Sequence, residues 1–179
     1  GRRIEAIDRR AKYLVFSLSD DETLIIHLKM SGHLSVVAAE TPADKYAHTV
    51  FELDDGRELR FRDPRKFGRV YLLRDPAYVL GPLGPEPLAE AFTVEALAAL
   101  LAGRKRVIKP LLLDQTFIAG IGNIYADEAL FYAGIRPTRR SDSLTAGETA
   151  ALHAAIQKVL GMGIEREGAS IGTYVKADG

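Results

Sequence analysis

The chain has 179 residues, no cysteine, and 24 basic residues balanced by 24 acidic ones. This length fits one domain or two small ones, and the 47% hydrophobic content predicts a packed core and excludes wholesale disorder. The lack of cysteine excludes disulfides and cysteine-ligated metal, and no apolar run approaches the ~20 residues that cross a bilayer. Basic residues concentrate in 60–69 and 103–109, so we expect a basic face within a neutral total.

Residues 1 to about 74 are predicted to form β-structure. The Asp55-Gly56 pair between two apolar runs is typical of a hairpin turn. Several short strands separated by turns indicate an antiparallel sandwich or barrel. The strands that we expect are 13–18, 23–28, 50–53, 58–61 and 70–73.

A segment rich in proline and glycine follows, with four of the eight prolines in residues 76–88. Proline restricts the backbone and removes a hydrogen-bond donor, so we predict a linker without regular helix or strand. This prediction divides the chain into a β-domain of residues 1–75 and a helical domain of residues 89–179, an α+β fold.

The pattern after the linker is helical. Thr93 is expected to cap a first helix, and Pro110 limits a second that takes in residues 111–113. Asn123 is the expected N-cap of a third helix over 123–132. Thr145 and Glu148 form a capping box for a fourth, which we expect to end at residues 161–163.

The turn before the third helix contains Gly120 and Gly122. Free N–H groups and the positive end of the helix dipole suit a phosphate at such a helix start. On spacing alone, an ordinary turn between helices is the favoured interpretation.

Ordered motifs over nearly the whole chain resemble the formamidopyrimidine-DNA glycosylase family of bacterial base-excision repair enzymes. The resemblance implies a β-sandwich followed by a helix–two-turn–helix domain, with double-stranded DNA containing oxidised bases bound between them. It also implies a monomeric, cytoplasmic protein. The matching motifs are RAKYL at 10–14, HLKMSG at 27–32, DPRKFG at 63–68, LGPEPL at 83–88, IKPLLLDQ at 108–115 and GIGNIYADEAL at 120–130.

The family begins with a catalytic Pro-Glu and ends in a four-cysteine zinc finger, and neither is present in these residues. We therefore expect a fragment without cofactor or metal that is inactive by itself, whereas full-length members carry a structural zinc. Residues 165–179 match the start of the loop that closes over the extruded base in relatives.

The resemblance assigns a catalytic role to Lys12, beside the phosphate and base of the lesion, and a phosphate contact to His27. A solvated strand lysine and a structural histidine are the alternatives. An ammonium group there would hold a phosphate and stabilise developing negative charge.

Three residues match the family's intercalating side chains. Met30 corresponds to the residue that fills the void left by the flipped nucleotide, Arg65 to the one that reaches the orphaned base, and Phe67 to one that stacks on a neighbouring pair. A core methionine, a loop arginine and a buried aromatic are the alternatives. An arginine fork can read a base edge, and apolar side chains can replace lost stacking.

Further DNA contacts are implied for Asn123, which binds phosphate in relatives, and for one of Arg104 and Lys105. Tyr46 stands where relatives often carry a DNA-contacting histidine. Its hydroxyl can donate to phosphate but cannot carry positive charge, which puts that contact in doubt.

The favoured function is a bifunctional glycosylase and AP lyase acting on oxidised purines. One alternative is a DNA-binding module without chemistry. Another is the endonuclease VIII branch, which acts on oxidised pyrimidines, although the loop at 63–68 argues for the purine branch. An RNA-binding helix–two-turn–helix protein would explain the glycine turn but not that loop.

Overall fold

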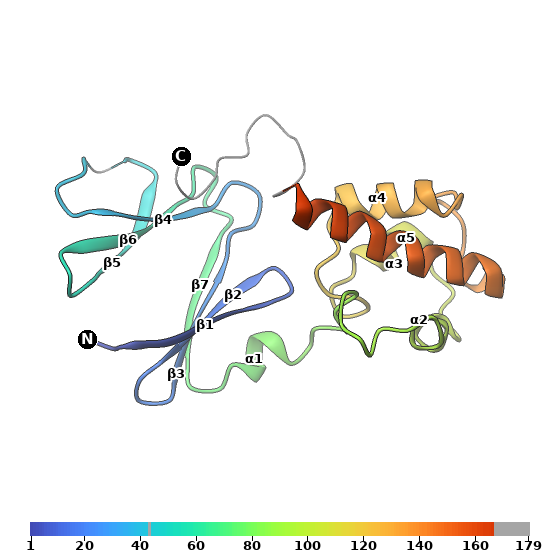
Figure 1. Ribbon diagram of the computed structural model, residues 1–179, viewed down its shortest axis with the longest axis horizontal. Coiled ribbons are helices and arrows are strands. Elements are labelled where there is room, and N and C mark those ends of the chain that lie inside the picture. Colours follow the sequence, from blue (N-terminus) through green and yellow to red (C-terminus); the bar gives the residue numbers. More distant parts are fainter. Residues whose placement is uncertain (43, 167–179) are drawn as a thin grey trace. The chain divides into compact units, whose positions relative to one another are not determined.

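The computed structural model describes residues 1–42 and 44–166 (Figure 1). The chain divides into two compact units, the first spanning Gly1–Leu80 and the second beginning at Gly81. The first unit consists of antiparallel sheets and one short helix at its end, and the second is helical, so the predicted α+β fold is confirmed. The loop predicted at 165–179 lies almost wholly outside the described residues.

The first unit contains two antiparallel sheets, one with strand order β1-β2-β3-β7 and one with order β4-β6-β5. The consecutive strands β1-β2, β2-β3 and β5-β6 pair as hairpins, whereas β3 pairs with β7 and β4 with β6. The chain crosses from one sheet to the other between β3 and β4 and again between β6 and β7. The strands are β1 Ile4–Arg10, β2 Tyr13–Leu18, β3 Glu22–His27, β4 His33–Ala38, β5 Ala47–Glu52, β6 Arg57–Arg62 and β7 Arg69–Leu73.

Local turn chemistry sets the hairpins. Asp20 and Asp21 both adopt positive φ between β2 and β3, the combination that the tight primed hairpin turn requires. Gly56 has φ +80° in the β5–β6 turn, and the Asp55 side chain accepts a hydrogen bond from the Arg57 amide at 3.1 Å. The hairpin predicted from the Asp-Gly pair is therefore confirmed.

Two strands, β1 and β4, were not among those predicted from the sequence. The edge strand β1 is almost entirely exposed, so no buried face imposes an alternation of apolar and polar residues on it. In β4 only part of the strand is covered, and its apolar residues are adjacent rather than alternating. The core of this unit is formed by Phe16, Leu24, Ile26, Leu59 and Phe61.

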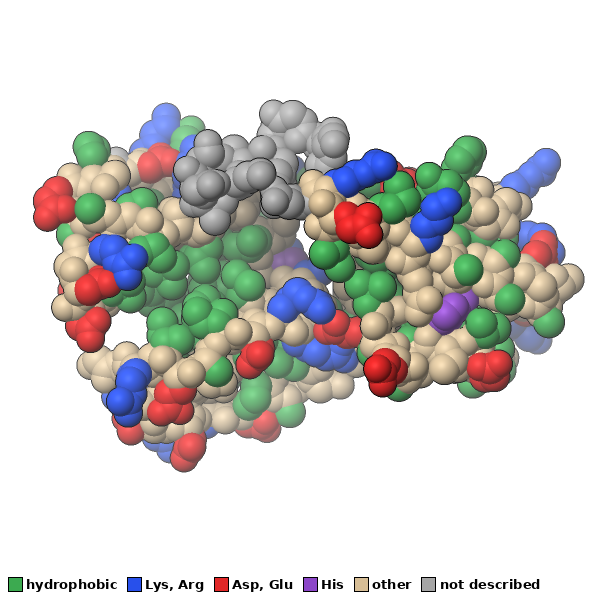
Figure 2. Space-filling view, viewed as in Figure 1, with side chains coloured by type: hydrophobic (Ala, Val, Ile, Leu, Met, Phe, Trp, Pro, Cys, Tyr) green, Lys and Arg blue, Asp and Glu red, His purple; other side chains and the backbone are tan. Residues whose placement is uncertain are grey.

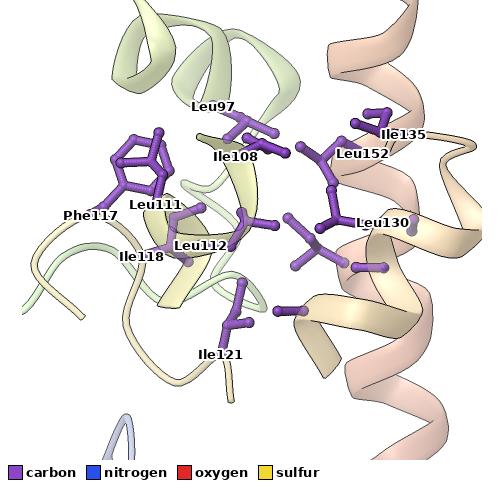
Figure 3. Packing of buried hydrophobic residues seen from close by; sticks show 14 of the residues in the cluster. Leu97, Ile108, Leu111, Leu112, Phe117, Ile118, Ile121, Leu130, Ile135 and Leu152 are labelled. Carbon is purple, nitrogen blue, oxygen red and sulfur yellow. The ribbon is translucent and has the colours of Figure 1, made fainter. Parts of the chain in front are cut away.

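The second unit is built around one larger apolar cluster. Figure 3 shows side chains of α2, α3, α4 and α5 meeting with those of the intervening loops. The helices are α2 Val94–Leu101, α3 Ile108–Leu113, α4 Asn123–Tyr132 and α5 Ala146–Glu165, with a short 3-10 helix, η1, at Ser141–Ser143. Thr93 caps α2, and the capping box of Thr145 and Glu148 begins α5, as predicted.

Two predictions of element boundaries were wrong. Helix α1, Ala77–Leu80, lies within the proline-rich segment, where the Asp75 carboxylate accepts a hydrogen bond from the Ala77 amide at 2.9 Å. Pro76 does not prevent this turn because a proline at a helix start loses no intrahelical bond. Helix α5 continues through Gly161 and Gly163 to Glu165, since glycine weakens a helix without ending it.

In the part of the chain that the structure describes, no helix is both long and apolar enough to cross a membrane. Within each unit, basic and acidic side chains are interspersed on the side shown in Figure 2. The expected basic face loses Arg60, which is buried and donates to Glu58 at 2.7 Å and to the Thr41 carbonyl at 2.8 Å.

Candidate nucleic-acid interface

The loops that connect the two sheets of the first unit bring together three of the predicted DNA-contacting residues. Met30 follows β3, whereas Arg65 and Phe67 lie between β6 and β7. The Arg65 guanidinium donates to the Met30 sulfur at 3.6 Å and lies 4.7 Å from the centre of the Phe67 ring. We call Met30, Arg65 and Phe67 the wedge cluster.

The wedge cluster faces solvent. Met30 is 75% exposed and Phe67 45% exposed, although both are large apolar side chains that folding usually buries. Within the described residues Arg65 forms no ion pair, so its charge is available to another molecule. An exposed apolar pair joined by an unpaired arginine suits insertion into a base stack.

A second group lies at one end of the larger sheet. Tyr13 and His27 are paired across β2 and β3, and their rings meet edge to face with centroids 4.7 Å apart. Lys12, in the turn before β2, and Lys29, after β3, both repel a positive charge on His27. Lys29 was not singled out from the sequence, because its position beside His27 depends on a left-handed backbone at φ +57°.

The surroundings of His27 keep its ring neutral. Burial is the main cause, and repulsion by Lys29 and Lys12 adds to it, so the pKa of His27 falls to about 4. Its Nδ1 accepts a hydrogen bond from the Lys29 amide at 2.9 Å, which leaves the proton on Nε2. Desolvation and Lys29 likewise lower the pKa of the Lys12 ammonium, although the residue as a whole is exposed.

Tyr46 lies next to the loop that carries Arg65. Its carbonyl accepts a hydrogen bond from the Asp63 amide at 2.9 Å. The Lys45 ammonium and the Arg62 guanidinium lie 4.9 and 5.1 Å from the centre of its ring. The Arg62 guanidinium is paired with Asp44, so Lys45 is the neighbour that provides positive charge at the position where relatives often carry a histidine.

In the second unit, Asn123 is exposed at the start of α4, but it is not the N-cap as predicted. Gly122 occupies that position, and no side chain caps the helix. Gln115 holds the turn that precedes this helix: its Oε1 accepts from the Gly120 amide at 2.9 Å and its Nε2 donates to the Ile121 carbonyl at 3.0 Å. Sequence reasoning assigned no role to Gln115, since its two hydrogen bonds form only once the chain folds back at residues 115–121.

The basic run at 103–109 is only partly neutralised. Arg106 pairs with Asp114 at 2.8 Å, and Lys109 pairs with Asp127 at 2.8 Å. Arg104 and Lys105 form no ion pair with any described residue, and the Arg104 guanidinium lies 5.9 Å from the centre of the Phe117 ring. Both therefore remain candidates for a phosphate contact.

The resemblance implies a structural zinc in the full-length family. Over the described ranges, no group of three or more histidines or acidic residues is placed to hold a metal ion, and the sequence has no cysteine. The described residues therefore provide no ligand set for that zinc.

Comparison with known proteins identifies the fold that carries these groups. Models of the formamidopyrimidine-DNA glycosylase N-terminal domain and H2TH domain match residues 1–70 and 83–175. The chain belongs to the formamidopyrimidine-DNA glycosylase family. The resemblance expected from the motifs is thus confirmed.

Individual relatives of this family cover almost the whole chain. The formamidopyrimidine-DNA glycosylase of Herpetosiphon aurantiacus is 51% identical, over 99% of this chain and 66% of its own length. The solved complex of Lactococcus lactis Fpg with abasic-site DNA has a TM-score of 0.89 at 35% identity, covering 99% of this chain and 66% of the other. A solved MutM complex with carbocyclic 8-oxo-G DNA has a TM-score of 0.90 at 36% identity, covering 99% and 68%. The chain spans about two thirds of the length of the curated relatives it matches.

Proposed function

We propose that this chain binds duplex DNA and fills the gap left by a flipped-out nucleotide, as part of a glycosylase that repairs oxidised purines. The observation that carries the proposal is the wedge cluster, in which Arg65 contacts both Met30 and Phe67 at an exposed surface. Flipping a base removes stacking contacts and leaves its partner unpaired. Two apolar side chains replace the stacking, and an arginine fork hydrogen-bonds the orphaned base.

Phosphate contacts orient the duplex around this cluster. Lys12 and the Nε2–H of His27 serve the first unit, and Asn123 with Arg104 or Lys105 serves the second. His27 acts as a neutral donor, so the charge contribution in the first unit comes from Lys12. Because phosphate contacts carry no sequence information, we expect affinity to depend on the lesion and on salt rather than on sequence.

In the full-length protein, we propose the chemistry of the family: the nitrogen of an N-terminal proline attacks C1′ of the flipped nucleotide and displaces the base. A Schiff base forms, and β- and δ-elimination then cut the strand. Lys12 supports these steps by holding the phosphate of the lesion and stabilising negative charge. The loop at 63–68 and the similarity to a MutM bound to carbocyclic 8-oxo-G DNA favour oxidised purines over pyrimidines.

A second candidate is a DNA-binding module without chemistry. The same residues support this candidate as well, because holding phosphates and filling a gap need no nucleophile. An RNA-binding role is less well supported, because it gives the wedge cluster no task.

The first test measures binding by the 179-residue chain to matched duplexes with and without a central abasic-site analogue. We expect the chain to prefer the abasic duplex, and Arg65→Ala to reduce that preference about tenfold, the value of a good arginine–base contact. Arg57→Ala, at the first residue of β6, is the charge-matched control and should retain the preference. Equal affinity of the unaltered chain for both duplexes, or tighter binding to duplex RNA, would refute the proposal.

The second test separates enzyme from binding module. The full-length natural protein is treated with borohydride in the presence of duplexes containing 8-oxoguanine or an oxidised pyrimidine. Covalent trapping on 8-oxoguanine supports the purine glycosylase. Trapping on the pyrimidine lesion alone supports the endonuclease VIII branch, and lesion binding without trapping on either supports the module.

A further inference from the structure

The two loops that form the wedge cluster run side by side from one sheet to the other. His27, the last residue of β3, pairs with Arg69, the first of β7. At the other ends of the loops, His33 of β4 pairs with Arg62 of β6. Both loops therefore begin and end at hydrogen-bonded neighbours, which keeps them close along their length.

One hydrogen-bonded group joins these loops. The Ser31 hydroxyl of the first loop donates to Asp63 Oδ1 of the second at 2.5 Å. The other oxygen, Oδ2, accepts from the Gly68 amide at 2.7 Å, and Oδ1 also lies 3.3 Å from the Arg65 amide. A single carboxylate thus closes its own loop around Arg65 and attaches that loop to the residue after Met30.

The ring of Phe61 forms the floor beneath both loops. A Cβ built on Gly68 would lie 2.3 Å from Phe61 Cζ, and one built on Gly32 would lie 2.8 Å from Phe61 Cε2. Both distances are shorter than carbon atoms tolerate, so only glycine lets each loop lie this close to the ring. Because the Phe61 ring lies beneath both loops and the Asp63 carboxylate joins them, the loops have little room to move separately.

Asp63 is an unusual residue to place here. It is 2% exposed, and no described basic side chain pairs with it. Burial alone raises the pKa of Asp63, but hydrogen bonds from Ser31 and from the amides of Gly68, Arg65 and Phe67 outweigh it and keep the pKa below its usual range. A buried carboxylate satisfied only by neutral donors is costly unless every donor stays in place, and this requirement fixes the loop geometry.

We propose that Asp63 and Ser31 are positioning residues that hold the wedge cluster assembled before DNA binds. The proposal rests on the proposed function of the wedge cluster. Neither side chain needs to touch DNA: Ser31 connects the loop of Met30 to Asp63, and Asp63 shapes the loop of Arg65 and Phe67. Preorganising the three side chains removes the entropy that ordering them on the duplex would otherwise consume.

The test uses substitutions of Ser31 in the 179-residue chain. Ser31→Ala removes the donor that links the loops, Ser31→Thr keeps the hydroxyl, and Ser35→Ala makes the same deletion in β4 outside the loops. Asp63→Asn is a second variant, since an amide cannot accept from both Ser31 and Gly68. If Asp63→Asn fails to fold, the Ser31 series carries the test alone.

Two readouts are measured on each folded variant. The first is affinity for an abasic-analogue duplex against the undamaged duplex, with 2-aminopurine opposite the gap reporting insertion. The second, without DNA, is amide hydrogen exchange in residues 28–32 and 63–68. We expect Ser31→Ala to lose about tenfold in affinity for the abasic duplex and to give a smaller change in 2-aminopurine fluorescence on binding. Amide exchange should be faster in both loops, and affinity for the undamaged duplex should stay within about twofold of the unaltered chain. Ser31→Thr and Ser35→Ala should behave like the unaltered chain.

The outcomes separate this proposal from the proposed function. If the unaltered chain prefers the abasic duplex but Ser31→Ala keeps its affinity, 2-aminopurine signal and exchange rates, the positioning role is wrong and the proposed function stands. Faster exchange with unchanged affinity also overturns the positioning role, because the Ser31–Asp63 hydrogen bond would then order the loops without contributing to DNA binding. If the unaltered chain shows no preference, the proposed function has failed, and the positioning role falls with it.

Discussion

His27 illustrates how tertiary neighbours change the chemistry of one residue. A histidine that follows an apolar strand can be structural or can bind phosphate, and sequence reasoning left both interpretations open. Burial and two nearby lysines lower its pKa to about 4, so it is a neutral hydrogen-bond donor at physiological pH. In contrast, a ring nitrogen of His153 lies 2.6 Å from the Phe92 carbonyl, a contact within the second unit that indicates a structural role.

The lowered pKa of His27 predicts a pH dependence of stability. Above pH 6.5 the ring is neutral in both the folded and the unfolded chain; between about pH 6.5 and 4 only the unfolded chain takes up the proton, so acidification favours unfolding. From pH 7 to pH 5, we expect the unaltered chain to lose about 1 kcal/mol more than His27→Gln, a figure reduced for partial solvent screening. Urea denaturation at the two pH values measures this difference.

His48→Gln, which alters an exposed histidine of β5 in the same unit, is the matched control and should follow the unaltered chain. Parallel pH dependence in the unaltered chain and in His27→Gln would show that burial does not perturb His27.

Among the structural elements, α4 and α5 show how glycine determines packing. The sequence favours a helix end at residues 161–163, but α5 continues because Gly163 lies against α4. A Cβ on Gly163 would come within 2.2 Å of the Tyr125 hydroxyl oxygen and 2.7 Å of its Cζ, whereas a Cβ on Gly161 would meet nothing within 4 Å. The two glycines, one half-turn apart, therefore have different roles.

This contrast predicts opposite effects for one substitution. Gly161→Ala should stabilise the chain by about 0.5–1 kcal/mol, since alanine reduces the entropy cost of the helix without a clash. Gly163→Ala gains the same helix propensity but must displace the Tyr125 ring, so we expect a net loss of about 1 kcal/mol. Thermal or urea unfolding of the two variants provides the comparison, and a stabilising Gly163→Ala would contradict the packing argument.

Considered as a whole molecule, the chain has no net charge, and each unit contributes its own candidate phosphate contacts. Lys12 and His27 belong to the first unit, while Asn123, Arg104 and Lys105 belong to the second. Arg106 and Lys109 are neutralised by ion pairs, which removes two residues from the basic run. The linear sequence does not distinguish these two residues from Arg104 and Lys105.

Salt dependence of binding tests whether both units contact the same duplex. Each phosphate contact by a cation contributes close to one to the slope of log affinity against log salt. We expect Lys12→Gln and Lys105→Gln each to reduce the slope by about one and the double variant by about two. If Arg104 is the contacting residue instead, Arg104→Gln reduces the slope and Lys105→Gln does not.

Asn123→Ala is the uncharged comparison, which should weaken binding without changing the slope. Arg140→Gln, whose guanidinium pairs with Asp142, should change neither quantity strongly. A double variant with the slope of either single variant would indicate that the two units do not contact one duplex together.

Much of the secondary structure and the choice of family were determined by the sequence, because they depend on residues close together in the chain. The Asp-Gly turn at 55–56, the Thr93 cap and the capping box of Thr145 and Glu148 each need only a few neighbours. The ordered set of short motifs likewise identifies the family without reference to the fold.

Only the tertiary structure decided which distant residues meet. Met30 touches Arg65, and Ser31 bonds to Asp63, because strand register brings two crossing loops together. Burial removed Arg60 from the expected basic face and neutralised His27. These outcomes depend on desolvation and on contacts across tens of residues, and local sequence patterns contain neither.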